Sequence, residues 1–366
     1  MGFTCGILGL PNVGKSTLFN ALTQTISAQA ENYPFCTIEP NFGRIAVPDQ
    51  RLGQIARLAN SEKIIPTNID FCDIAGLVKG ASKGEGLGNK FLAHIREVDA
   101  LVHVVRCFEN DNVMHVTGKI DPLDDIATIE TELMLADLET LEKRISLITK
   151  RARSNDKEAK KTLALLDLVM EGLEIGKPAR SLDVTEDSFE QFRQLQLLTA
   201  KPVIYVCNVD ENSAAEGNIH SEKVIAYAHG VNSIALCVSA AIESEVAQLS
   251  DKKEQSAFLE SLGLEETGLD RIILAGYNVL GLITFLTAGP KEARAWAIPK
   301  GTTASQAAGT IHTDFERGFI CAETISYEDY IHNEGEQGAK ETGKMRQEGR
   351  NYSVNDGDIM LFRFNV

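Results

Sequence analysis

The sequence predicts an α/β domain of the P-loop type that carries a helical insertion and is followed by a smaller α+β module. Three observations support this fold class. A complete GxxxxGK[ST] motif occupies residues 9–16, between a short apolar run and a helix-compatible run. Strand-length apolar runs then alternate with helical segments, except between residues 126 and 200, where two helical stripes occur. A different pattern of short strands begins near residue 279.

Residues 9–16 predict a phosphate-binding loop. Gly9 and Gly14 let the backbone bend so that successive N–H groups face one phosphate chain. The following helix contributes the positive end of its dipole, Lys15 contributes a mobile charge, and Ser16 contributes a hydroxyl that can ligate Mg²⁺. The residues that we expect to contact the nucleotide here are Gly9, Asn12, Val13, Gly14, Lys15, Ser16 and Thr17.

The strands of the predicted sheet are apolar runs of five or so residues. They are residues 3–8, 43–47, 69–72, 100–106, 203–207 and 234–238. Several are continuously apolar, which is typical of strands that are buried on both faces of a parallel sheet. In such a sheet the ligand binds at the carboxyl ends of the strands.

Residues 73–76 (DIAG) directly follow one of these runs and are typical of a turn that senses the γ-phosphate. Asp73 can order the Mg²⁺ shell through water, and the Gly76 N–H can meet the γ-phosphate. Thr37, on the segment before this turn, can supply a second hydroxyl to Mg²⁺, with an ordinary loop threonine as the alternative. The glycine-rich residues 79–88 favour a mobile switch over a linker.

Residues 126–200 predict an antiparallel helical hairpin that protrudes as an arm, with ordinary surface helices as the alternative. Its apolar stripes are Met134, Leu138, Leu141, Ile145 and Ile148, and then Ala159, Leu163, Leu166, Met170 and Leu173. Residues 143–161 form a basic tip with two acids, Asp156 and Glu158. Its basic residues are Lys143, Arg144, Lys150, Arg151, Arg153, Lys157, Lys160 and Lys161. The tip is either a docking site for phosphate backbones or a solvated helix face.

The chain beyond residue 279 predicts the α+β module. Its expected strands are 294–298, 319–325 and 359–364, with a helix over 303–311 and a turn at 356–358. We therefore assign residues 1–278 to the nucleotide-binding domain, interrupted by the insertion, and residues 279–366 to the second domain.

The composition of the chain argues against several other classes of protein. The net charge of −16 argues against nonspecific coating of nucleic acid by the whole surface. The seven cysteines form no CxxC pair and the seven histidines no HxxxH pair, so neither a disulfide framework nor a zinc site is indicated. No run of 18 apolar residues and no secretory leader pattern occurs, so we expect a cytoplasmic protein that does not interact with membranes.

The motifs of residues 12–17, 32–41, 73–78 and 356–358 resemble those of Obg-related GTPases, and most specifically of the YchF (Obg-like ATPase) family. The resemblance covers essentially the whole chain. It implies a nucleotide-binding domain with an inserted coiled-coil arm, and a C-terminal TGS domain of β-grasp fold. It also implies a preference for ATP and an association with ribosomes.

The base-recognition segment departs from the usual Asn-Lys-x-Asp pattern, because residues 208–211 read NVDE. A carboxylate at the N1 and N2 edge of guanine discriminates strongly, so its displacement disfavours GTP. Asn208 can instead pair with N6 and N7 of adenine. Asp210 is able to take the guanine role, so GTP remains the second choice. The residues expected around the base are Asn208, Val209, Glu211, Ser239, Ala240 and Ala241.

Leu77 stands where Ras-like enzymes hold a glutamine that orients the attacking water, so we expect slow intrinsic hydrolysis. His115, in a polar loop after the strand at 100–106, is the candidate to orient or deprotonate that water. A solvated loop histidine is the alternative. His94 and His103 are expected to be structural.

These features predict a Mg²⁺-dependent ATPase that acts as a conformational switch on ribosomes, with the large subunit favoured, or on another RNA-containing assembly. The partner is expected to contact the basic tip or the TGS domain, and no DNA sequence specificity is expected. A GTP-specific translation-associated GTPase and a binding scaffold with negligible turnover are the alternatives. A metabolic kinase is disfavoured by the turn at residues 73–76 and by the glycine-rich segment after it.

Overall fold

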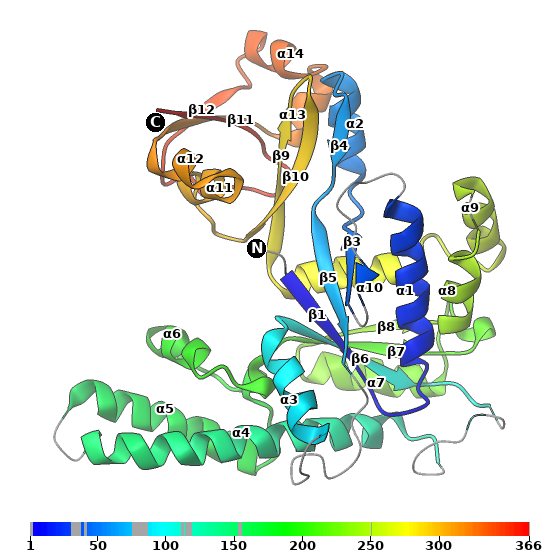
Figure 1. Cartoon of the computed structure of the whole chain (residues 1–366), viewed down its shortest axis with the longest axis vertical. Helices are drawn as coiled ribbons and strands as arrows, with labels where there is room; N and C mark the ends of the chain where they lie inside the picture. The colour runs from blue at the N-terminus through cyan, green and yellow to red at the C-terminus, as the bar shows by residue number, and fades with distance from the viewer. Residues whose placement is uncertain are drawn as a thin grey trace.

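The computed structural model contains two β-sheets and a long helical hairpin (Figure 1). The residues that it describes are 3–30, 38–39, 42–74, 87–110, 113, 119–152, 156–249 and 251–365. Within these residues, no helix is both long and apolar enough to cross a membrane.

The first sheet has the strand order β2-β3-β5-β1-β6-β7-β8 among the described residues. Its strands are β1 (Phe3–Leu8), β2 (Ile38–Glu39), β3 (Phe42–Ala46), β5 (Asn68–Asp73), β6 (Ala100–Arg106), β7 (Val203–Asn208) and β8 (Ile234–Val238). The five strands from β5 to β8 in this order are parallel, as the apolar runs predict. The run at 43–47 differs, because β3 is antiparallel to both β5 and β2. The chain leaves β3 and re-enters at β5 from the same end of the sheet, so no crossover makes the pair parallel.

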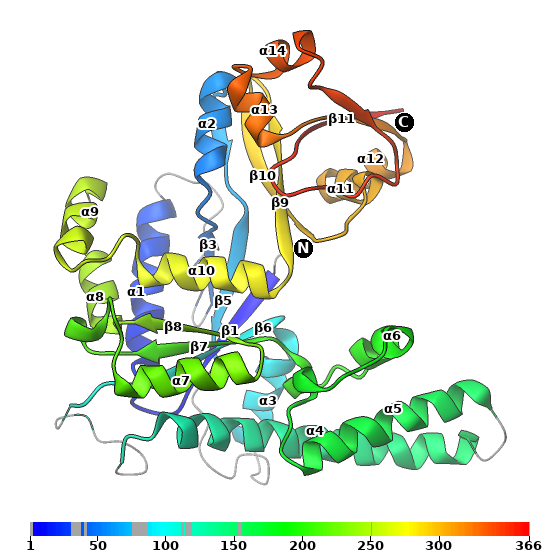
Figure 2. The ribbon, with the colours of Figure 1, turned by 180° about the vertical axis from the view of Figure 1, so that it is seen from behind.

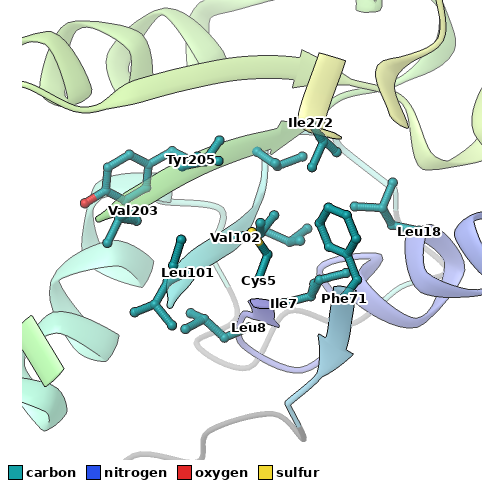
Figure 3. Packing of buried hydrophobic residues seen from close by; sticks show 14 of the residues in the cluster. Cys5, Ile7, Leu8, Leu18, Phe71, Leu101, Val102, Val203, Tyr205 and Ile272 are labelled. Carbon is teal, nitrogen blue, oxygen red and sulfur yellow. The ribbon is translucent and has the colours of Figure 1, made fainter. Parts of the chain in front are cut away.

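Helices pack against this sheet and complete its core. They include α1 (Lys15–Ala30), α3 (Leu87–Glu97), α7 (Ile219–Gly230), α8 (Ala240–Val246) and α10 (Gly268–Val279). Helix α9 (Lys252–Ser261) packs against α8 in a separate small cluster. Figure 3 shows Phe71 and Val102 on the sheet with Leu18 of α1 and Ile272 of α10 beside them. All four side chains are at most 2% exposed. Cys5 belongs to the same cluster, and its burial raises the pKa of the thiol to about 12, so it behaves as a small apolar side chain.

Two antiparallel helices, α4 (Pro122–Ala152) and α5 (Lys157–Glu174), lie between β6 and β7 in the chain and extend away from the first sheet (Figures 1 and 2). Leu141, Leu166 and Val169 are fully buried between them and helix α6 (Glu186–Gln194). The Asp156 carboxylate begins α5 by accepting hydrogen bonds from the two N–H groups of Glu158 and Ala159 at 3.1 and 3.2 Å.

A buried polar cluster fastens this hairpin to the first sheet. Glu130 of α4 pairs with Arg180 of the short 3-10 helix η2 (Ala179–Ser181). The same carboxylate accepts hydrogen bonds from the hydroxyls of Tyr205 on β7 at 2.6 Å and of Tyr227 on α7 at 3.3 Å. Because each partner of this buried carboxylate comes from a different element, the base of the hairpin is held in one orientation.

The second sheet has the order β12-β11-β13-β9-β10-β4 among the described residues. Its strands are β4 (Lys63–Ile65), β9 (Leu282–Ala288), β10 (Glu292–Pro299), β11 (Phe319–Ile325), β12 (Arg346–Glu348) and β13 (Ile359–Phe364). The strands expected at 294–298, 319–325 and 359–364 are present as β10, β11 and β13. One apolar cluster of this sheet includes α11 (Ala304–Ile311), with α12 (Thr313–Arg317) beside it. The other includes α2 (Gln50–Leu58), α13 (Tyr327–His332) and α14 (Glu336–Glu341).

One segment of the second sheet comes from the N-terminal part of the chain. Strand β4 pairs in parallel with β10, with Ile65 opposite Arg294. Leu52 and Ile55 of α2 are buried in the same cluster as Leu286 and Ile359. A division of the chain at residue 279 therefore leaves out a segment, α2 and β4, that folds with the second sheet.

Candidate nucleotide-binding site

The loop of residues 9–14 connects β1 to α1 at the carboxyl edge of the first sheet. Its backbone takes left-handed conformations at Asn12 (φ 63°) and Gly14 (φ 91°). A Cβ atom on Gly9 would lie 2.6 Å from the carbonyl oxygen of Val104, and one on Gly14 would overlap the Asn208 amide. Glycine is therefore required at both positions by close approach of neighbouring strands, and at Gly14 also by the backbone angle.

The structure brings the loop lysine together with the acid that ends β5. The Lys15 ammonium forms an ion pair with the Asp73 carboxylate. Their side chains are 11% and 16% exposed, so the pair is largely shielded from water. Ser16 and Thr17, in the first turn of α1, are exposed. A phosphate chain over this turn would draw the ammonium away and leave the carboxylate free for a water of a metal shell.

Asn208 contacts two loops of the candidate site. Its Nδ2 donates to the Val13 carbonyl at 2.9 Å, and its Oδ1 accepts from the Ala240 N–H at 3.0 Å. The residue is only 6% exposed. Because both ends of the amide already bind backbone groups, these contacts favour a positioning role over pairing with adenine. Asn208 links the phosphate loop to the loop that begins α8.

The remaining residues expected around the base surround the ends of β7 and β8. Val209 is buried, and its N–H donates to the Val238 carbonyl at 3.0 Å. Asp210 is exposed and its carboxylate accepts from the N–H and hydroxyl of Ser213 at 3.2 and 3.0 Å. Glu211 begins the short 3-10 helix η4 (Glu211–Ser213) and is exposed.

The loop at the start of α8 contains a buried hydroxyl. Ser239 is 3% exposed, and its Oγ has no hydrogen-bond partner among the described residues. Ala240 is buried, and its N–H is taken by Asn208, whereas Ala241 is exposed. Ser239 therefore offers an unused donor and acceptor next to the residue that links the two loops.

Four residues expected at the site, Thr37, Gly76, Leu77 and His115, lie outside the described residues. Among the described residues, no three His, Cys, Asp or Glu side chains come together as a metal site. Mg²⁺ does not need such a group, because it keeps several waters and binds proteins through few oxygen ligands plus substrate phosphates. The Ser16 hydroxyl and the Asp73 carboxylate are oxygen donors of the kind that it prefers, so the residues present fit this ion.

Arg106 is a residue that the sequence reasoning missed. It ends β6, is 1% exposed, and its guanidinium donates to the carbonyls of Phe108, Asn110 and Val113 at 3.2, 3.2 and 2.8 Å. Burial lowers the pKa of this guanidinium. Arg106 thereby holds the backbone carbonyls of three residues that follow β6. The sequence signal for this residue is a single arginine at the end of an otherwise apolar strand.

His103 lies within the same strand and is buried, as a structural histidine should be. Its burial lowers the pKa of the imidazole to about 3, so the ring is neutral at physiological pH.

Full-length relatives decide the family. A protein of Bacillus subtilis (strain 168) with the name Ribosome-binding ATPase YchF is 55% identical over 368 residues, which cover 100% of both chains. A protein of Escherichia coli O157:H7 with the same name is 55% identical over 366 residues, again across 100% of both chains. The chain belongs to the YchF family.

Family models and a solved structure agree with membership of the YchF family. Residues 4–150 match a model described as 50S ribosome-binding GTPase, and residues 282–365 match the model YchF-GTPase_C, described as a protein of unknown function. The structure of the Schizosaccharomyces pombe YchF GTPase has a TM-score of 0.89 and 36% identity, and the match covers 99% of this chain and 98% of that one. The resemblance inferred from the motifs is thus confirmed.

Proposed function

We propose that this member of the YchF family is a Mg²⁺-dependent ATPase that acts as a nucleotide-dependent switch on ribosomes in the cytoplasm. The convergence of Lys15, Asp73 and Asn208 on one glycine-rich loop is the observation that carries the nucleotide site. The names of the full-length relatives, Ribosome-binding ATPase YchF, support the activity and the partner.

In this proposal the loop backbone and Lys15 hold the phosphates, and Ser16 and Thr37 hold the metal. Asp73 would release Lys15 and would then accept a hydrogen bond from a water beside the metal, and the Gly76 N–H would meet the γ-phosphate. When bound, Mg²⁺ supplies neutralisation of the charge that the phosphates share.

The preference for ATP follows from the segment at residues 208–211. The stacking lysine of guanine-specific relatives is replaced by Val209, whose side chain is buried. Asp210, the next residue in the chain, already accepts hydrogen bonds from Ser213. The base contacts are left to the loop of Ser239, Ala240 and Ala241 and to Glu211. A GTP-specific enzyme remains the alternative, because Asp210 is exposed and able to reach a ligand.

Slow hydrolysis is part of this proposal, because the Leu77 side chain has no polar atom with which to orient water. His115 is the proposed group that orients it. If neither His115 nor a partner activates water, the protein is a nucleotide-regulated scaffold with negligible turnover.

The proposed ribosome contact is the basic tip of the hairpin, with the C-terminal TGS-type domain as the second docking surface. Lys143 and Lys161 are 73% and 71% exposed, and their acidic neighbours Glu139 and Glu158 lie at 2.7 and 4.0 Å. Exposed ion pairs of this kind contribute little to stability, so they do not prevent binding to phosphates. We propose RNA of the large subunit as this partner, because a basic tip fits a phosphate backbone.

Side-by-side measurements of nucleotide binding and turnover test the proposal. Calorimetry should show tighter binding of ATP than of GTP, and single-turnover hydrolysis of ATP should be slow alone and faster with ribosomes. Tighter binding of GTP would favour the GTPase alternative. Absent turnover with and without ribosomes would favour the scaffold.

A further inference from the structure

We propose that α2 and β4 couple the nucleotide site to the second sheet, and that the ion pair between Arg51 and Asp356 carries this coupling. The inference rests on the proposed function, because it identifies how the nucleotide state would reach a surface that binds the ribosome. It assigns to Arg51 a positioning role in a contact far from the phosphates.

The first observation is the path of the chain between the two segments expected to sense the γ-phosphate. β3 follows the segment of Thr37, and β5 ends at Asp73, and both belong to the first sheet. The connection between them leaves that sheet and supplies α2 and β4 to the second (Figure 1). The second sheet therefore receives its edge strand from within the nucleotide-sensing part of the chain.

The second observation is that β4 and β5 form one nearly continuous extended run. β4 ends at Ile65 and β5 begins at Asn68. Residues 63–73 thus reach from the second sheet to the ion-pair partner of Lys15. An extended run of this length spans about 35 Å at ~3.3 Å per residue. Since β5 is paired on both sides, with β1 and with β3, it can transmit a displacement along its length.

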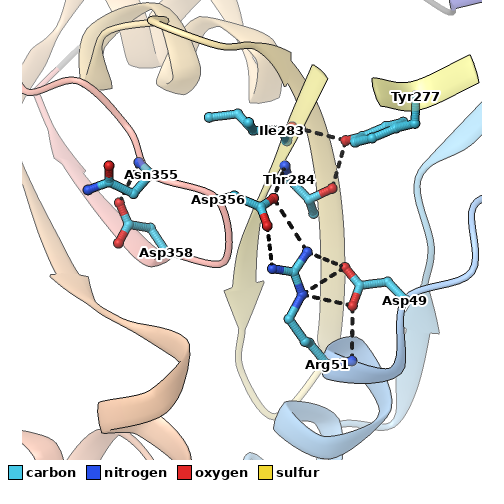
Figure 4. A network of polar contacts seen from close by, with 8 residues as sticks. All are labelled: Asp49, Arg51, Tyr277, Ile283, Thr284, Asn355, Asp356 and Asp358. Carbon is cyan, nitrogen blue, oxygen red and sulfur yellow. Dashed lines mark hydrogen bonds and ion pairs between the residues drawn. The ribbon is translucent and has the colours of Figure 1, made fainter. Parts of the chain in front are cut away.

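The third observation is a set of contacts that fastens α2 to the second sheet (Figure 4). The Arg51 guanidinium donates to Asp356 Oδ2 at 2.6 Å and to Asp49 Oδ2 at 2.8 Å. The other carboxylate oxygen of Asp356 accepts from the Thr284 N–H on β9 at 2.8 Å. Thr284 Oγ1 in turn lies 2.6 Å from the hydroxyl of Tyr277, at the end of α10.

The connection from α2 to β4 is also attached to the second sheet. The Ser61 hydroxyl donates to the Gly289 carbonyl at 2.7 Å, and the Glu62 N–H donates to the Pro290 carbonyl at 3.0 Å. Both acceptors lie in the turn between β9 and β10. The apolar face of α2 is also buried against this sheet, so both ends of the segment are packed on it.

The segment from α2 to β5 therefore joins the nucleotide site to the second sheet. At one end, Asp73 exchanges partners when phosphates attract Lys15. At the other end, Arg51 holds α2 to Asp356 in the turn before β13. Coupling between two sites is reciprocal, so a partner bound to the second sheet changes nucleotide affinity by the same factor as nucleotide changes the affinity for that partner.

Ribosome affinity in two nucleotide states tests the coupling. We would measure the ribosome Kd of the full chain with a non-hydrolysable ATP analogue and with ADP, and take the ratio. The variants are Arg51→Gln and Asp356→Asn, and the latter retains an oxygen that can accept from Thr284. Arg57→Gln is the matched control, because Arg57 lies on the same helix, is exposed, and donates to the Gly53 carbonyl of that helix.

The wild type and Arg57→Gln should show a ratio of at least about fivefold, which is the lower end of typical coupling. Arg51→Gln and Asp356→Asn should bring the ratio close to one, while the nucleotide affinity of the free protein changes less than twofold. A ratio that survives in both variants overturns the inference.

Hydrogen exchange in the free protein provides a readout that does not need the ribosome. Amides of residues 282–299 should exchange differently with the ATP analogue and with ADP in the wild type and in Arg57→Gln, but not in Arg51→Gln. An identical exchange in both nucleotide states of the wild type overturns the coupling. If the exchange difference is present but no ribosome binding occurs in any state, the proposed partner is wrong and the coupling stands.

Discussion

At the scale of single residues, the site is organised by side chains that bind backbone groups or each other. Lys15 has Asp73 as its partner, and Asn208 joins the carbonyl of Val13 to the N–H of Ala240. A buried amide with both ends engaged costs free energy when it is truncated, because its former partners lose their hydrogen bonds. These contacts hold the loop in its binding shape.

Lys15→Ala should weaken binding of ATP by about 10- to 100-fold, because a hydrogen bond to a charged group contributes about 1.5–3 kcal/mol. Calorimetry with ATP and Mg²⁺ checks this, with Lys119→Ala as a control at a side chain that is 81% exposed. Thermal unfolding without nucleotide should also shift to a lower temperature, because the variant leaves the shielded Asp73 carboxylate without its ion-pair partner. A lower melting temperature with unchanged affinity would show that Lys15 stabilises the fold and does not bind phosphate.

Asn208→Ala should weaken ATP and GTP by similar factors, because the side chain positions two loops that both nucleotides use. Competition titration with the two nucleotides measures this, and Asn212→Ala in the exposed 3-10 helix serves as a control. A loss confined to ATP would restore the direct pairing with adenine that the sequence suggests.

At the scale of elements, the contact between α8 and α10 and the α4–α5 hairpin have different roles. The Glu243 carboxylate on α8 accepts from the N–H groups of Gly268 and Leu269 at 2.7 and 3.1 Å, which joins α8 to the start of α10. The free end of the hairpin of α4 and α5 lies far from the start of α1 (Figure 2). The contact between α8 and α10 stabilises the domain, whereas the hairpin is available to bind a partner.

Glu243 should make stability depend on pH. Burial raises the pKa of this carboxyl from its ordinary 4.5 to about 7. The raised pKa means that the folded state favours the protonated form of Glu243. The stability that this group contributes is therefore fully present below pH 4.5 and is lost as the pH rises through about 7. The side chain of the Glu243→Gln variant cannot ionise. As the pH rises over this range, the free energy of unfolding should therefore fall less steeply in the variant than in the wild type, and the two slopes should differ by up to about 1.4 kcal/mol per pH unit.

Urea unfolding of both proteins between about pH 5 and 8 measures this difference. Glu245→Gln, at an exposed position of the same helix, is the control and should retain the wild-type slope. Equal slopes for Glu243→Gln and the wild type would show that Glu243 does not titrate in this range.

The basic tip should contact RNA. Changing Lys150, Arg151, Arg153 and Lys157 to glutamine should weaken ribosome binding and flatten its salt dependence, by about one unit of slope for each phosphate that the variant no longer neutralises. Affinity for ATP should stay constant. Co-sedimentation across a salt series tests this, and the matched control changes four exposed residues elsewhere, Lys252, Lys253, Lys291 and Lys300. Unchanged binding would make the C-terminal domain the leading docking surface.

At the scale of the whole molecule, the two sheets are joined by more than the peptide link between α10 and β9. The excursion through α2 and β4 gives the second sheet part of its core, since Leu52, Ile55 and Ala56 are at most 3% exposed. Neither sheet is therefore complete when the chain is cut between them. The first would retain an uncovered helix, and the second would lack its edge strand.

A chain that ends at residue 279 should consequently aggregate, because α2 exposes its apolar face once β9, β10 and α13 are missing. Light scattering of the purified fragment measures this. The same fragment with Leu52→Gln and Ile55→Gln should stay monomeric to higher concentration, whereas the fragment with Arg57→Gln should not. A monomeric, soluble unmodified fragment would show that α2 packs elsewhere when the second sheet is absent.

The sequence by itself determined the phosphate loop, the parallel strands, the two long helices and the family. Each of these depends on residues that are close together in the chain. Gly9, Gly14 and Lys15 act within one turn, and the strands and long helices carry the periodicity of their buried faces. The observed β1, β6 and β8 even have the bounds that their apolar runs predict.

Only the tertiary structure decided where short or polar segments find their partners. Periodicity indicates that α2 has an apolar face but not which of two sheets covers it, and the three residues of β4 are too few to show a period. The ion pair of Lys15 with Asp73 spans 58 residues, and that of Arg51 with Asp356 spans 305. Such contacts depend on how the strands are ordered in space. For the same reason, the sequence did not show that Asn208 links two loops or that β4 lies at an edge of the second sheet.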